Sequence, residues 1–61
     1  MEKIYNIKEI QIEHINNVLK PFINVTCIYN RTRQGYKLTI QGNKIEVERF
    51  IRILNEENII D

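Results

Sequence analysis

Residues 23–41, which read INVTCIYNRTRQGYKLTIQ, decide the fold. Apolar and polar side chains alternate in both halves, and both halves are rich in β-branched and aromatic residues, which is typical of strands with one buried face. Gly35 stands between the two halves, so they are expected to form an antiparallel hairpin. The alternating apolar positions are Ile23, Val25, Cys27 and Tyr29, followed by Tyr36, Leu38 and Ile40.

The turn of this hairpin admits two lengths that keep the apolar side chains of both strands on one face. A two-residue turn at Gln34–Gly35 pairs Arg33 with Tyr36. A four-residue loop over 32–35 leaves the same side chains on the same face. The hairpin is therefore better determined by the sequence than its turn type.

Upstream of the hairpin, residues 7–19 carry apolar side chains along one arc of a helix and polar side chains along the other. Asn6 stands three residues before Glu9, the spacing of a capping box at a helix start. Pro21 disfavours helical geometry at the preceding residue, so this helix is expected to end one or two residues before it.

A second helix is expected downstream of the hairpin. Asn43 is its N-cap, with Glu46 three residues later, and the helix ends near Glu57 or Asn58. Its apolar stripe consists of Val47, Phe50, Ile51 and Leu54, with Ile53 at the edge. The remaining apolar pair, Ile59–Ile60, folds back as a cap, adds a strand or meets a partner.

The expected fold class is α+β, in one domain that spans residues 1–61. Its order is α-β-β-α, with two helices on one face of the hairpin, either with or without a short extra strand at residues 2–5. Two strands alone are marginally stable. The sheet is therefore expected to gain a third strand from a terminus, or to pair with a second copy of the chain in a homodimer.

Composition and counting exclude most enzymes. Cys27 and His14 are the only nucleophile and base of their kinds, and each occurs once. Cys27 falls on the inward face of its strand, where a small core residue is the expected role, and His14 falls among isoleucines. One histidine with scattered carboxylates does not make a metal site, and no glycine-rich loop is present to hold a phosphate cofactor. We expect no catalytic residues, no metal and no cofactor.

The chain also lacks the features of a membrane protein. Its apolar residues are dispersed, whereas a spanning helix needs roughly 20 in succession. No basic segment followed by an apolar one opens the chain, so export by a signal peptide is not expected. A single cysteine suits a reducing cytoplasm.

Charge is distributed unevenly along the chain. The formal net charge is +1, but the first thirteen residues sum to −1 and the last sixteen to −3. Every charged residue in between is basic: Lys20, Arg31, Arg33, Lys37 and Lys44. A nearly neutral total thus conceals a basic hairpin between two acidic ends.

Three of these cations, Arg31, Arg33 and Lys37, gather at the hairpin tip beside Tyr29 and Tyr36. Guanidinium groups bind phosphates and guanine edges, and aromatic rings stack on unpaired bases. The five residues are therefore the candidate site of a small non-enzymatic binding module that contacts RNA or DNA.

Two alternatives remain open at this point. The same cations protect an exposed strand edge from aggregation in many hairpins. The chain also suits a small protein-protein interaction protein that inhibits or adapts a host protein, using the basic tip, the acidic second helix or the Ile59–Ile60 tail. Its many isoleucines and asparagines and its lack of alanine are typical of AT-rich genomes, which favours a phage or mobile-element origin.

Overall fold

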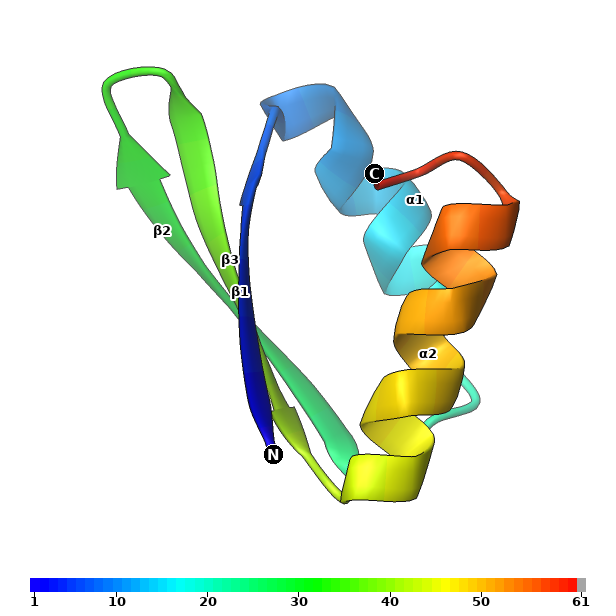
Figure 1. Cartoon of the computed structure of the whole chain (residues 1–61). Helices are drawn as coiled ribbons and strands as arrows, with labels where there is room; N and C mark the ends of the chain where they lie inside the picture. The colour runs from blue at the N-terminus through cyan, green and yellow to red at the C-terminus, as the bar shows by residue number, and fades with distance from the viewer. Residues whose placement is uncertain (61) are drawn as a thin grey trace.

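In the computed structural model, which describes residues 1–60, a three-stranded antiparallel sheet carries both helices on one face (Figure 1). The elements are β1 (Glu2–Ile7), α1 (Glu9–Leu19), β2 (Val25–Thr32), β3 (Gly35–Gly42) and α2 (Lys44–Glu56). The sheet order is β1-β3-β2. The predicted fold class is confirmed: the chain is a small α+β domain with an additional N-terminal strand.

The N-terminal strand completes the sheet within one copy of the chain. It pairs antiparallel with β3, from Glu2 opposite Gln41 to Ile7 opposite Tyr36. The strand is longer than the expected residues 2–5. Since β2 pairs with the other edge of β3, the central strand is bonded on both sides.

The predicted cap of the first helix is wrong. Asn6 lies in β1 opposite Lys37, and α1 begins only at Glu9. The Oε1 atom of Gln11 accepts a hydrogen bond from the Lys8 backbone N–H at 2.6 Å, which helps to satisfy the helix start. Tyr5 and Ile7, on either side of Asn6, pair with Leu38 and Tyr36 of β3 and hold Asn6 in the strand, so it does not cap the helix.

In the hairpin, the strands pair in the register expected for the four-residue loop over 32–35. Thr32 pairs with Gly35 and Arg31 with Tyr36, so the turn residues are those at 33 and 34 rather than the predicted Gln34–Gly35. Gly35 has a φ of +147°, and a Cβ there would clash with the carbonyl oxygen of Ile7. The glycine thus allows the end of β1 to approach the hairpin closely. Both registers leave the same side chains on each face because they differ by an even number of residues.

The core lies between the helices and the sheet. Leu38 and Ile40 of β3 are fully buried beneath Ile15 of α1 and Phe50 of α2. The ring of Phe22 meets that of Phe50 edge to face, with ring centroids 5.4 Å apart. The buried apolar set is Ile7, Ile15, Val25, Leu38, Ile40, Val47, Phe50, Leu54 and Ile60.

The C-terminal tail folds back as a cap, which was one of its three expected roles. Asn58 adopts a left-handed backbone with φ 56°, and the Ile59 N–H donates to the Leu54 carbonyl at 2.8 Å. The side-chain amide of Gln11 donates to the Ile59 carbonyl. These contacts bury Ile60 against the core.

The start of α2 is as predicted. The Oδ1 atom of Asn43 accepts from the backbone N–H groups of Ile45 at 3.0 Å and Glu46 at 3.3 Å. Two N–H groups that the helix itself leaves without partners are thereby bonded.

Replacement of the two asparagines that have the same sequence signature distinguishes the real cap from the apparent one. Asn43→Ala is expected to lower the free energy of unfolding by about 1 kcal/mol, because it removes a cap. Asn6→Ala, at an exposed position in β1, is the matched control and is expected to cost clearly less. Urea unfolding of both variants measures the difference, and an equal or larger loss for Asn6→Ala would contradict the assignment.

Candidate nucleic-acid interface

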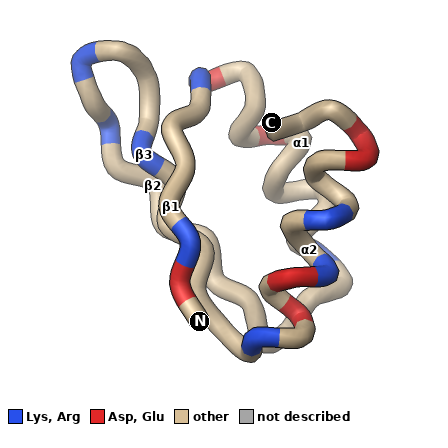
Figure 2. The backbone as a smooth tube through the Cα atoms, in the orientation of Figure 1, with Lys and Arg blue, Asp and Glu red and all other residues tan. Residues whose placement is uncertain are grey.

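Four cationic residues lie near the free end of the hairpin, and Figure 2 shows basic positions along the backbone there. Arg31 lies near the end of β2, Arg33 in the turn and Lys37 near the start of β3. Lys8, between β1 and α1, reaches the same end because Ile7 pairs with Tyr36. All four cations are exposed. The sequence analysis missed Lys8, since only the pairing of β1 with β3 brings it to the hairpin.

A hollow of about 280 Å³ opens between the hairpin turn and the end of β1. Its lining residues are Asn6, Ile7, Lys8, Thr32, Gln34 and Tyr36. The lining offers one ammonium, two amides and a hydroxyl beside an aromatic ring. Such side chains can donate hydrogen bonds to phosphate and sugar oxygens.

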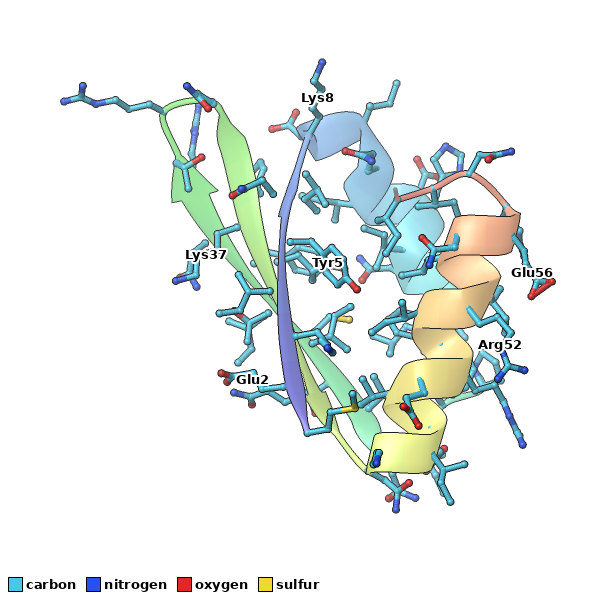
Figure 3. All side chains as sticks on the ribbon, viewed as in Figure 1. Glu2, Tyr5, Lys8, Lys37, Arg52 and Glu56 are labelled. Carbon is cyan, nitrogen blue, oxygen red and sulfur yellow. The ribbon has the colours of Figure 1, made fainter. Side chains whose placement is uncertain are left out.

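The pairing separates the predicted site residues onto two faces. Arg31 is directly opposite Tyr36, and both lie on the face that the helices cover. Lys37 is opposite Asn30 on the other face, and Figure 3 shows it on the side of the sheet away from the helices. The structure therefore brings Arg31 and Tyr36 together, with Lys37 behind them.

Both predicted tyrosines link the hairpin to α1 by side-chain hydrogen bonds. The Tyr29 hydroxyl donates to Oδ1 of Asn16 at 2.8 Å, and the Tyr36 hydroxyl donates to Oε1 of Glu9 at 3.3 Å. Both side chains are half-buried. Tyr36 still lines the hollow, whereas Tyr29 is opposite Leu38, closer to the core.

Cys27 lies next to Tyr29 on the helix-covered face of β2. Burial raises the pKa of the Cys27 thiol to about 11, and a hydrogen bond with Tyr29 opposes part of that shift. Burial also raises the pKa of Tyr29 to about 12, with Cys27 adding to the shift. Both groups are neutral near pH 7, which suits packing rather than nucleophilic chemistry.

The expectations on a metal site, on His14 and on a membrane-spanning helix also apply to residues 1–60. Within them no three His, Cys, Asp or Glu side chains come together as metal ligands. His14 is exposed on α1, where it lines a shallow hollow with the C-terminal tail. None of the helices described is long and apolar enough to cross a membrane.

Comparison of the chain with protein-family models, with curated proteins and with solved structures gives no match. No residue role is therefore transferred from a relative. The placement of charge and hydrogen-bonding groups at the hairpin end is the feature on which a function can be based.

The half-buried thiol of Cys27 and phenol of Tyr29 predict that stability falls at alkaline pH. Both pKa values are raised by folding, so their contribution is complete below the ordinary values of 9.0 and 10.0 and is lost as the pH rises through about 11 and 12. Urea unfolding across this range is expected to show a falling free energy of unfolding. Cys27→Ala should remove the part that begins near pH 9.0, and an unchanged pH dependence in this variant would contradict its burial.

Proposed function

We propose that the chain is a small non-enzymatic binding module that contacts RNA or DNA through the basic end of its hairpin. The observation that carries this proposal is the convergence of Lys8, Arg31, Arg33 and Lys37 from different strands and their connections at one end of the sheet. Because all four side chains are exposed, they can reach phosphates without first breaking internal packing.

The charge around the site supports an anionic ligand. Glu9 lies beside Lys8, and its carboxylate accepts a hydrogen bond from Tyr36, so this end of the sheet has one negative charge against its four positive ones. Most other acidic residues lie away from the hairpin end, on α2, on α1 and at the start of β1 (Figure 2). The resulting asymmetry orients a polyanion toward the hairpin, even though the net charge is only +1.

Each site residue has a distinct proposed role. Arg31 and Arg33 bind phosphates with their forked guanidinium groups, and Lys8 adds a third charge across the hollow. Tyr36 offers a ring at the wall of the hollow on which an unpaired base can stack. Tyr29 positions the hairpin on α1, and Lys37 contributes charge from the opposite face. Phosphate contacts predominate, so we expect little sequence preference.

A second candidate function is binding to an acidic surface of a host protein, as an inhibitor or adaptor of phage or mobile-element type in the cytoplasm. The exposed arginines favour it, because guanidinium groups bind carboxylates as well as phosphates. The tail version of this hypothesis has less support, since Ile60 is buried against the core of its own chain.

Neutralisation of the tip arginines tests the nucleic-acid proposal. Arg31→Gln/Arg33→Gln is expected to weaken binding to a mixed-sequence oligonucleotide about tenfold at low salt, and to reduce the slope of log affinity against log salt by about 2. Fluorescence anisotropy with labelled single- and double-stranded RNA and DNA, at several salt concentrations, measures both quantities.

The matched control is Arg49→Gln/Arg52→Gln, which removes the same charge from exposed positions on α2. This variant is expected to retain most of the affinity. If both double variants lose affinity equally, net charge and not the hairpin end governs binding. If the unaltered protein binds none of the oligonucleotides at low salt, the proposal fails and an acidic protein partner takes its place.

A further inference from the structure

The face of the sheet away from the helices, here called the open face, has no covering element within residues 1–60 (Figure 1). The pairing arranges its side chains in three rows across β1, β3 and β2. The rows are Glu2, Gln41 and Thr26; Ile4, Thr39 and Ile28; and Asn6, Lys37 and Asn30.

The middle row, here called the apolar row, has an exposed isoleucine on each side of a central threonine. Ile4 is 53% exposed and Ile28 is 41% exposed, although both lie in regular strands. Thr39 between them is only 8% exposed, so the two isoleucines enclose it. Covering exposed apolar area of this kind with a second surface removes it from water, which favours association.

The outer rows carry opposite charges. Lys37 lies in one outer row and Glu2 in the other, and Figure 3 shows both on the side of the sheet away from the helices. The Nε2 atom of Gln41 donates to Oε2 of Glu2 at 2.7 Å. This hydrogen bond draws the carboxylate toward β3, the strand that carries Lys37.

We propose that the open face binds a second copy of the chain, sheet against sheet, about a twofold axis that runs along the apolar row. This symmetry places Ile4 on Ile4 and Ile28 on Ile28 of the two copies. It also exchanges the outer rows, so Lys37 of one copy faces the Gln41–Glu2 pair of the other, twice per dimer.

The alternative twofold axis, parallel to the strands, is disfavoured by the same charges. It would place Lys37 of one copy against Lys37 of the other, with no carboxylate between them. Like charges that face each other in an interface oppose association. The charge pattern thus selects one of the two ways in which identical faces can pack.

The size of the open face predicts a weak dimer. Three strands at a spacing of about 4.8 Å make a small face, well below the roughly 800 Å² per partner of a standard interface. The dimer is therefore expected to form reversibly at high protein concentration. It leaves Arg31 on the helix-covered face and Arg33 in the turn, and it covers Lys37, the one cation that both proposals use. The dimer itself is argued from the open face alone and does not rest on the proposed nucleic-acid function.

Charge exchange across the interface is the most specific test. In sedimentation equilibrium over a series of concentrations, Glu2→Lys and Lys37→Glu are each expected to weaken the dimer about tenfold or more, because each places like charges together twice. The double variant Glu2→Lys/Lys37→Glu restores opposite charges and should restore the dimer. Thermal unfolding by circular dichroism confirms that each variant folds.

The apolar row is tested separately by Ile28→Lys, which should abolish the dimer. Ile23→Lys is the matched control, since Ile23 is 88% exposed in the connection between α1 and β2, outside the sheet. A protein that stays monomeric at every concentration overturns the proposal. So does a dimer that survives Ile28→Lys, or a double charge variant that associates no better than the single variants.

Discussion

The pairing of β1 with β3 is the interaction on which the rest of the structure depends. It turns a two-stranded hairpin into a three-stranded sheet and makes β3 the central strand. Leu38 and Ile40 of that strand are fully buried, and both helices pack on the face that they form. The same pairing supplies the third strand of the sheet without a second copy of the chain.

This pairing also creates both proposed interaction surfaces. It carries Lys8 to the end of the hairpin, where the chain order alone would place it far from Arg33. On the open face it sets Glu2 and Ile4 beside β3. β1 thus contributes a carboxylate and an apolar side chain to the open face, and the residue that follows β1 contributes a cation to the basic end.

The features that depend on neighbouring residues could be predicted from the sequence. The alternation over residues 23–41 predicts the hairpin, and Asn43 predicts the start of α2, because strand alternation and helix caps are local patterns. Asn6 has the same capping signature as Asn43, but it is paired in a strand. The competing partner, β3, lies about thirty residues away, and no local pattern encodes that pairing.

Of the candidate site, the sequence could predict the cations of the hairpin tip but not the contacts that depend on other elements. The tip cations follow from the sequence, since Arg31, Arg33 and Lys37 flank a single turn. The helix partners of the tyrosines, Asn16 and Glu9, depend on how α1 crosses the sheet, which spacing along the chain does not specify. The contribution of Lys8 could not be predicted either, because it depends on the pairing of β1 with β3.

An amide-resolved NMR titration with a short oligonucleotide tests the central claim, that the hairpin end is the binding surface. The account predicts that shifts gather at Lys8 and over residues 31–36 and weaken steeply as salt is added. Shifts centred on α2 would contradict it, as would an absence of shifts at low salt.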